Sequence, residues 1–297
     1  MPDVLSVVRT SSDHSVLATA EKGLRLVGAL LTSAWLSGCV GVFANDGQSL
    51  SLGSHGKGAL LHGVAMPFEG SGYEVHPDWR PRDHRYATGA VVHWLTEVFR
   101  DVDRQAPGST VYLGDLSGRN GGDAAMHRSH SSGRDIDIFF LASDFTGVPL
   151  RGLPAMVHFA GDGRALRWSV AKVGRVITQP IPTSHFDAQR NWAVVRALLE
   201  TPGSEVQWIF IHRDLAGLLI AEAEREGAPA ALLNRARALL HQPTDSQPHD
   251  DHMHVRVFCD PSDRPFGCSD KGPRRWLKKH WKYLRSGAPL FSSNPTE

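Results

Sequence analysis

Apolar side chains between residues 91 and 102 recur every three or four positions. This spacing places them along one stripe of a helix, and the set is Val91, Val92, Trp94, Leu95, Val98, Phe99 and Val102. It predicts a long amphipathic helix. Similar patterns predict three more helices, with Asp187 and Asp214 as N-terminal caps, over Asp187 to Glu200, Leu215 to Glu226 and Pro229 to His241.

Short apolar runs of strand length predict four strands, at Thr110 to Leu113, Asp135 to Leu141, Val206 to His212 and Met253 to Phe258. Residues 40–85 are rich in Gly, Ser and His, and we expect irregular loops there. Because the strands and helices do not alternate regularly, the pattern favours the α+β class over a doubly wound sheet. We therefore expect a small antiparallel β-sheet core flanked by helices and long loops.

The composition indicates a globular protein with one main domain. The chain has 297 residues, of which 41% are hydrophobic and 21% charged, so it can bury a normal core. Its formal net charge of +1 gives no reason to expect attraction to nucleic acid, and none is predicted as a partner. The partner must be inferred from the functional site.

The amino terminus is typical of an exported protein. Leu26 to Leu36 is an apolar stretch of signal-peptide length that follows basic residues and is short for a membrane span. The tetrapeptide LSGC that ends at Cys39 resembles the lipobox of bacterial lipoproteins, which implies cleavage before Cys39 and a lipid on its thiol. The alternative is a chance cysteine after a core helix. We predict a lipoprotein-type signal segment over residues 1–39 and a folded domain over residues 40–297, which contains the motifs described below.

The two other cysteines agree with export. Cys259 and Cys268 enclose eight residues that include two prolines and a glycine, so a small disulfide loop is sterically reasonable in an oxidising compartment. The alternative is a pair of reduced thiols in a cytosolic protein. Together with the lipobox, the cysteines favour the periplasm or cell envelope, with membrane anchoring through Cys39.

The run HRSHSSGRDIDIFF, residues 127–140, crowds histidines and aspartates ahead of an apolar segment. In a strand, Asp135 and Asp137 share one face, while the isoleucines beside them face the core. Gly133 lets the chain turn, so that His130 can fold back beside Asp137 from the preceding loop. An imidazole and a carboxylate can therefore converge.

The run HDDHMHVRVF, residues 249–258, repeats this logic. In a strand, His252, His254 and Arg256 project to one side, and the apolar residues between them project to the core side. A neutral imidazole is a common zinc ligand. Two histidines and one aspartate leave a fourth coordination position for water, as in catalytic zinc sites. We expect the two runs to hold one zinc ion per chain.

These residues resemble a known group of proteins. His-x6-Asp followed far downstream by His-x-His is similar to the pattern of lysostaphin, the D-Ala-D-Ala metallopeptidases and the hedgehog signalling domain. The resemblance to the penicillin-insensitive murein endopeptidases is closer and covers about residues 50–270. It rests on the motifs NGG at 120–122, H-x-x-H-x-x-G-x-D-x-D-I-F at 127–139, and H-x-x-H-M-H-V-R at 249–256 with a cysteine at 259.

The resemblance implies a role for each motif residue. The zinc ligands would be His130, Asp137 and His254. The general base or transition-state stabiliser would be His252, two positions from a ligand on the same strand face. The remaining motif histidines, His127 and His249, would support the ligands or polarise the substrate.

Two aspartates and the other histidines have less definite roles. We expect Asp135 to orient a loop or a histidine rather than bind the metal. Asp251 is a rival base, because the dipeptidase branch of the group carries its catalytic Glu in an E-x-x-H pattern. Strand alternation points Asp251 away from His254, unless the strand begins only at His252, so Asp251 ranks second to His252. Histidines without a partner pattern are read as structural or exposed, namely His55, His62, His76, His84, His158, His185 and His212.

The resemblance implies that the chain is an enzyme acting on peptidoglycan peptides. The expected reaction is hydrolysis of the D-alanyl-meso-diaminopimelate cross-link by a metal-activated water. The alternatives are a D-Ala-D-Ala carboxypeptidase or dipeptidase of the same group, and a non-catalytic, zinc-containing murein-binding lipoprotein. The presence of His252 beside the three ligands favours an enzyme, since a structural site has no use for a base. The oligomeric state is left open.

Overall fold

A computed structural model of the chain describes residues 48–122, 127–151, 156–172, 175–180, 184–244 and 246–270. The predicted signal segment and Cys39 lie outside these residues, so they stay predictions. Among the described residues, no helix is long and apolar enough to cross a membrane.

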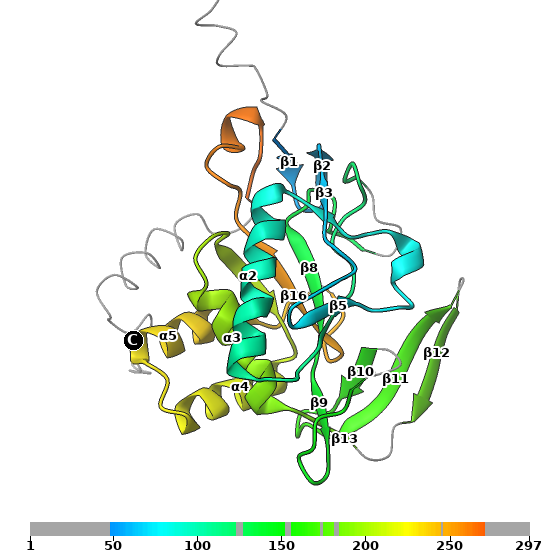
Figure 1. Ribbon diagram of the computed structural model, residues 1–297, viewed down its shortest axis with the longest axis vertical. Coiled ribbons are helices and arrows are strands. Elements are labelled where there is room, and N and C mark those ends of the chain that lie inside the picture. The colour runs from blue at the N-terminus through cyan, green and yellow to red at the C-terminus, as the bar shows by residue number, and fades with distance from the viewer. Residues whose placement is uncertain are drawn as a thin grey trace, which may run out of the picture. The chain divides into compact units, whose positions relative to one another are not determined.

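The centre of the fold is a mixed sheet of seven strands in the order β15-β14-β16-β8-β7-β5-β4 (Figure 1). The middle neighbours β14, β16, β8 and β7 run antiparallel, whereas β14 pairs with β15, and β5 with β7, in parallel. The strands are β4 (Glu69–Gly70), β5 (Tyr73–Val75), β7 (Val111–Leu113), β8 (Asp135–Phe139), β14 (Val206–Phe210), β15 (Leu240–His241) and β16 (His252–Val257).

Smaller sheets surround this one. They pair β1 (Leu50–Ser54) with β2 (Lys57–Leu61), β3 (Val64–Ala65) with β6 (Tyr86–Ala87), β9 (Ala142–Asp144) with β13 (Ser184–Phe186), and β10 (Met156–Phe159) with β11 (Ala165–Lys172) and β12 (Arg175–Pro180). Two short 3-10 helices are η1 (Arg80–Arg82) and η2 (Arg264–Phe266).

The prediction of irregular loops before residue 85 was wrong, because five strands lie between Leu50 and Val75. These strands are short, and their frequent Gly, Ser and His residues hide any alternation. Two of the pairings are local hairpins, β1 with β2 and β4 with β5. Other contacts of this segment are remote in sequence: the amide of Gly53 donates to Gly267, and that of Leu60 donates to Asn120.

The four predicted helices are present as α2 (Gly89–Gln105), α3 (Ala188–Glu200), α4 (Arg213–Arg225) and α5 (Ala230–Leu239). Asp187 caps α3 as predicted, accepting from the amide of Arg190. The cap predicted at Asp214 was wrong: His212 caps α4, and its side chain accepts from the amide of Asp214. Four helices packed with a mixed sheet and small hairpins confirm the α+β class.

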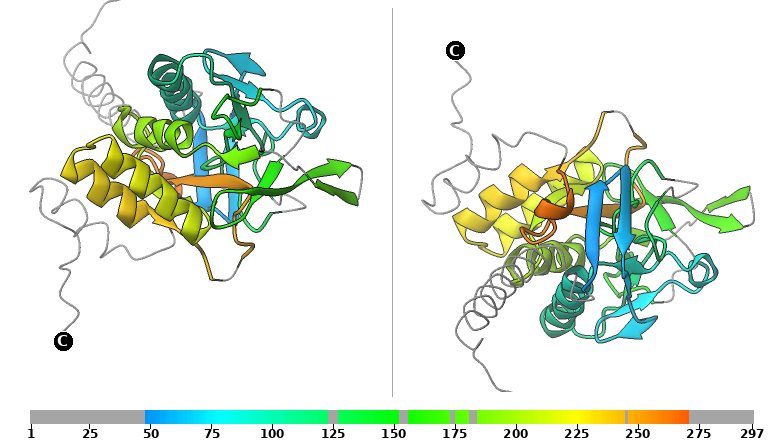
Figure 2. Two further views of the ribbon diagram at one scale, coloured as in Figure 1. Left: turned by 90° about the horizontal axis from the view of Figure 1, so that it is seen from below. Right: turned by 90° about the horizontal axis from the view of Figure 1, so that it is seen from above.

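The helices gather on one side of the described unit. Helix α3 packs against α2, α4 and α5, and α5 also contacts β14. In both views of Figure 2 the three-stranded β10-β11-β12 sheet extends away from the yellow helices α4 and α5. The site described below lies where β16 and β8 pair.

The register of β16 against β8 separates the core from the site. Met253 lies opposite Ile138 and Val255 opposite Ile136, and all four side chains are fully buried in the hydrophobic core. The intervening pairs are His254 opposite Asp137 and Arg256 opposite Asp135. Because side chains alternate along a strand, these polar pairs project from the other face of the sheet.

Candidate metal centre

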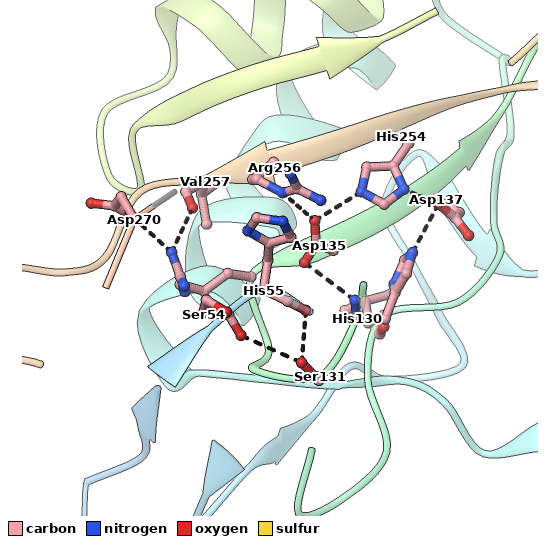
Figure 3. A network of polar contacts seen from close by, with 12 residues as sticks. Ser54, His55, His130, Ser131, Asp135, Asp137, His254, Arg256, Val257 and Asp270 are labelled. Carbon is pink, nitrogen blue, oxygen red and sulfur yellow. Dashed lines mark hydrogen bonds and ion pairs between the residues drawn. The ribbon is translucent and has the colours of Figure 1, made fainter. Parts of the chain in front are cut away.

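Strands β8 and β16 bring a carboxylate and an imidazole together. Asp137 and His254 are register partners, and His254 Nδ1 lies 3.1 Å from Asp137 Oδ1. Their side chains come from the green and orange strands and meet at the right of Figure 3. Both residues are buried, with exposed fractions of 1% for Asp137 and 5% for His254. Rigid paired strands therefore fix two groups at one point.

The loop before β8 supplies a second imidazole. His130 has a left-handed backbone, with φ of 68°, and its amide donates to Asp135 Oδ2 at 3.3 Å. The neighbouring Ser131 hydroxyl donates to His55 O at 2.7 Å, which ties the loop to the β1-β2 hairpin (Figure 3). His130 Nδ1 bonds to the carbonyl of Leu116, so Nε2 is the nitrogen that faces Asp137. The loop turns His130 inward, as the sequence predicts.

Three imidazole nitrogens face one oxygen, Asp137 Oδ1. The distances are 3.1 Å from His254 Nδ1, 3.3 Å from His130 Nε2 and 3.5 Å from His252 Nε2. Ligand atoms bound at 2.0–2.1 Å to a tetrahedral zinc lie about 3.3 Å from one another, so this spacing fits the ion.

Two of these buried atoms have no hydrogen-bond partner among the described residues. Within the described part of the chain, neither His130 Nε2 nor Asp137 Oδ1 makes a hydrogen bond of normal geometry. Leaving buried polar atoms unpaired is costly unless a ligand satisfies them. The atoms are therefore well suited to a cation.

The metal-capable residues form two adjoining sets. The ligand atoms of His127, His130 and Asp137 lie within 4.8 Å of one another, and so do those of His249, His252 and His254. The two sets touch, because the rings of His130 and His254 have centroids 4.7 Å apart. The structure thus brings the five motif histidines and Asp137 into one cluster.

Asp135 supports both strands of the centre. Its Oδ1 accepts from His254 Nε2 at 2.8 Å and from Arg256 Nε at 2.7 Å (Figure 3). Burial opposes the charged form, but Arg256 and then His254 outweigh it and hold the pKa of Asp135 below its usual value. The ionised carboxylate therefore fixes the ring of His254 with Nδ1 toward Asp137, the second-layer contact that metal-bound histidines typically make.

His252 is the most exposed of the three nitrogen donors, with 16% of its side chain accessible. Its Nδ1 lies 2.7 Å from Asp251 Oδ1, which leaves Nε2 directed at Asp137. Burial opposes its charged form, but the charges of Asp251 and Asp137 prevail and raise the pKa of His252 to about 9 in the metal-free protein. It is a strong proton acceptor.

The exception to the alternation argument about Asp251 applies in the structure. Strand β16 begins only at His252, so Asp251 lies in the preceding bend and its side chain reaches His252. Asp251 does not reach the Asp137 oxygen directly in any recorded contact among the described residues. Its contact with the centre passes through His252.

The two remaining motif histidines lie at opposite sides of the cluster. Burial, together with the nearby His252 and His254, lowers the pKa of His249 to about 4, so it is neutral at physiological pH. Its ring centroid is 5.2 Å from that of His252. His127 Nε2 lies 2.8 Å from Asp115 Oδ2, and its ring centroid is 4.5 Å from that of His130.

Sequence reasoning assigned no role at the centre to several polar residues that lie beside it. Asp115 is 1% exposed, and besides His127 it pairs with Arg82 at 2.7 Å and lies 3.8 Å from His84. The position of Asp115 directly after the predicted strand at 110–113 could have indicated it. His158, read as structural or exposed, lies beside Asp250 and Asp251; no pattern could have shown this, because 92 residues separate His158 from Asp250.

A buried support closes the far end of β16. A disulfide joins Cys259 and Cys268, as predicted, and the amide of Cys259 donates to Asp270. Asp270 also pairs with buried Arg134 at 2.8 Å, and Arg134 reaches the carbonyl of Val257 (Figure 3). These contacts join the start of β8 to the end of β16 and to the disulfide loop that follows.

Imidazoles and a buried carboxylate on one face of a sheet, with a partly exposed histidine beside them, are typical of metal-dependent hydrolases. The profile of one family of peptidases, the penicillin-insensitive murein endopeptidases, matches residues 51–276. The chain belongs to this family.

Curated relatives carry the same family description. A penicillin-insensitive murein endopeptidase of Klebsiella pneumoniae (strain 342) is 27% identical over 266 residues, covering 84% of this chain and 79% of the relative. One of Haemophilus influenzae is 23% identical over 231 residues, covering 77% and 70%. One of Yersinia enterocolitica is 26% identical over 224 residues, covering 72% and 67%. Family membership implies action in the cell envelope, with peptidoglycan as the substrate.

Proposed function

We propose that the protein is a zinc-dependent endopeptidase that hydrolyses the D-alanyl-meso-diaminopimelate cross-links of peptidoglycan. Family membership supports the substrate class. The observation that carries the metal dependence is the convergence of three imidazole nitrogens within 3.5 Å of Asp137 Oδ1. Such a group of neutral and anionic donors has no structural advantage over apolar packing, but it fits a cation.

His130, Asp137 and His254 are the proposed zinc ligands. They are the three most buried members of the cluster, and each ligand histidine has its other ring nitrogen occupied, His130 by the Leu116 carbonyl and His254 by Asp135. When bound, zinc lowers the pKa of water to about 7 and polarises the scissile carbonyl. Together, these three donors would hold one such ion per chain.

His252 is the proposed general base. Its Nδ1 faces Asp251, so Nε2 is the free nitrogen, directed at the centre and on its solvent-accessible side. With a cation bound, Asp137 would share its charge with the ion, and the pKa of His252 would be lower than in the metal-free protein. Nε2 then accepts a proton from the attacking water and returns it to the leaving amine.

His249 and His127 are proposed to contact the substrate or hold the ligands. His249 is neutral and can donate one N–H to the peptide carbonyl. His127 is held by Asp115 against the ring of His130. No serine is acylated in this mechanism, so β-lactams would have no nucleophile to trap.

Anchoring is a further part of the proposal. Cleavage before Cys39 and its lipidation would hold residues 40–297 at the membrane surface of the periplasm. The disulfide between Cys259 and Cys268 supports an oxidising compartment. Mass spectrometry of the membrane-associated protein should find a lipid on Cys39; a free thiol at that position would contradict the anchor.

The activity is tested with purified peptidoglycan and protein that lacks residues 1–39. We expect loss of cross-linked dimers, blocked by a chelator and restored by zinc. His130→Ala should lose both zinc and activity. His252→Ala should keep the zinc and lose about 10²- to 10⁴-fold in kcat, because only proton transfer is removed. His93→Ala, at an exposed histidine of α2, is the matched control.

Other outcomes separate the alternatives. Unchanged dimers with released D-alanine would identify a carboxypeptidase, and release of free dipeptide would identify a dipeptidase. A protein that binds peptidoglycan and zinc but cleaves nothing would be a non-catalytic binder. Retention of activity in His252→Ala would contradict the assignment of the base.

A further inference from the structure

A second polar cluster, formed by His158, Asp250 and Asp251, adjoins the metal centre. His158 lies on β10, whereas the aspartates lie in the segment just before β16. His158 Nδ1 lies 2.9 Å from Asp250 Oδ1, and its Nε2 lies 3.6 Å from Asp251 Oδ2. Each ring nitrogen thus faces one carboxylate.

The cluster is continuous with the proposed base. Asp251 uses its two oxygens differently: Oδ2 faces His158, and Oδ1 lies 2.7 Å from His252 Nδ1. A carboxylate that accepts from Nδ1 fixes both the tautomer and the rotation of an imidazole. The direction of His252 Nε2 therefore depends on where Asp251 is held.

Backbone contacts fix the cluster as well. The amide of Phe159, the residue after His158, donates to the carbonyl of Asp250 at 2.9 Å. The side chains of His158, Asp250 and Asp251 are between 14% and 19% exposed, so water competes only partly for their contacts. Strand β10 is thus attached to the segment that positions the base.

We propose that His158, with Asp250, is a positioning residue that holds Asp251, and that Asp251 in turn orients His252 for proton transfer. The chain His158-Asp251-His252 extends the mechanism to β10, a strand outside the seven-stranded sheet. The inference rests on the proposed function for its catalytic consequence. The orientation of His252 is measurable without any substrate.

The first measurement is the proton resonance of His252 Nδ1–H in selectively labelled protein, with and without zinc. A short bond to a carboxylate gives a strongly downfield resonance, and Nδ1 carries the proton in both protonation states of this arrangement. We expect the resonance to vanish in Asp251→Asn and to move upfield in His158→Leu. Asp162→Asn, at an exposed aspartate, is the matched control and should leave it unchanged.

The second measurement separates kcat from KM on a purified cross-linked muropeptide. His158→Leu should lower kcat about 10- to 100-fold with little change in KM, as for other losses of an orienting partner. In His158→Gln the side-chain amide nitrogen can take the position of Nε2 and reach toward Asp251. In His158→Asn it takes the position of Nδ1 and faces Asp250. We therefore expect His158→Gln to recover more activity than His158→Asn.

Two results would overturn the inference. One is an Nδ1–H resonance of His252 that is identical in wild type, Asp251→Asn and His158→Leu. The other is a zinc titration with two ions per wild-type chain and one in His158→Leu, which would make the cluster a metal site. If the resonances change as expected but the wild type does not cleave the muropeptide, the proposed function fails and the positioning role stands.

Discussion

Replacement of Asp135 by Asn tests the polar support beneath the metal centre. Asp135 is fully buried, and one of its oxygens accepts from both His254 and Arg256. The variant keeps the shape of the side chain but removes its charge. Asparagine also turns an N–H donor toward the amide of His130, which donates to the second oxygen in the wild type.

The expected loss of stability is about 3–5 kcal/mol. Each hydrogen bond to a charged group contributes about 1.5–3 kcal/mol, and Asp135 makes two short ones. Removing one partner of a buried ion pair costs about 3–5 kcal/mol, because the other charge stays buried and unpaired. Arg256 would keep its contact with the face of Phe210, 5.0 Å from the ring centroid, but lose its charged partner. Two hydrogen bonds at these values give about 3–6 kcal/mol, which agrees with the figure for the ion pair and is a large part of the about 5–15 kcal/mol of a typical domain.

The assay is urea unfolding of the metal-free protein, followed by zinc competition with a chelating dye. Asp135→Asn should also weaken zinc binding about 10- to 100-fold, since His254 loses its orienting partner. Arg256→Gln in the same background should restore part of the stability, because it removes the unpaired charge. Asp162→Asn is the surface control. Full stability with unchanged zinc affinity, or strictly additive effects of the two substitutions, would refute this account of Asp135.

Two other predictions concern pH and backbone strain. Burial raises the pKa of Glu205 to about 7, so between its unfolded value of 4.5 and about 7 the folded state binds more protons, and stability falls as pH rises through this window. The free energy of unfolding is measured in urea at about pH 5 and about pH 8. Glu205→Gln should remove about 2–3 kcal/mol of the loss between the two pH values, whereas exposed Glu69→Gln should not. An equal loss of stability in the wild type and in Glu205→Gln would contradict this prediction. At His249, with φ of 53°, His249→Gly should be about 1 kcal/mol more stable than His249→Ala in thermal unfolding, the reverse of the usual order, because glycine has no Cβ to clash in this left-handed conformation.

The sequence was most informative where the two halves of the site lie on strands. Alternation over Asp135–Phe139 and His252–Val257 predicts which side chains share a face, and the register places Asp137 opposite His254. Strand geometry is local and strongly constrained, so two residues on the same face stay on it whatever the rest of the chain does. What alternation cannot supply is the register between strands that lie more than 100 residues apart.

The parts that escaped prediction depend on contacts that are remote in sequence. His158 contacts Asp250 because β10 lies against the segment before β16. Asp115 contacts Arg82, the last residue of the 3-10 helix η1. The ranking of Asp251 depended on a strand boundary, which shifts easily by one or two residues. The strand begins at His252, so alternation does not govern Asp251, and its side chain contacts His252.

The two loops before β8 and β16 supply imidazoles that the strands alone do not provide. A strand can direct alternate side chains to a point, and left-handed residues in the preceding loops, His130 and His249, add two further imidazoles to the cluster. Such conformations cost about 1–3 kcal/mol each and persist only where other contacts impose them. Asp135 binds the amide of His130 and also the side chains of His254 and Arg256, so a single carboxylate joins the strained loop to both paired strands. For this reason a change at Asp135 should disturb both the loop before β8 and strand β16. A change at His130 should disturb mainly that loop, and a change at His254 mainly β16.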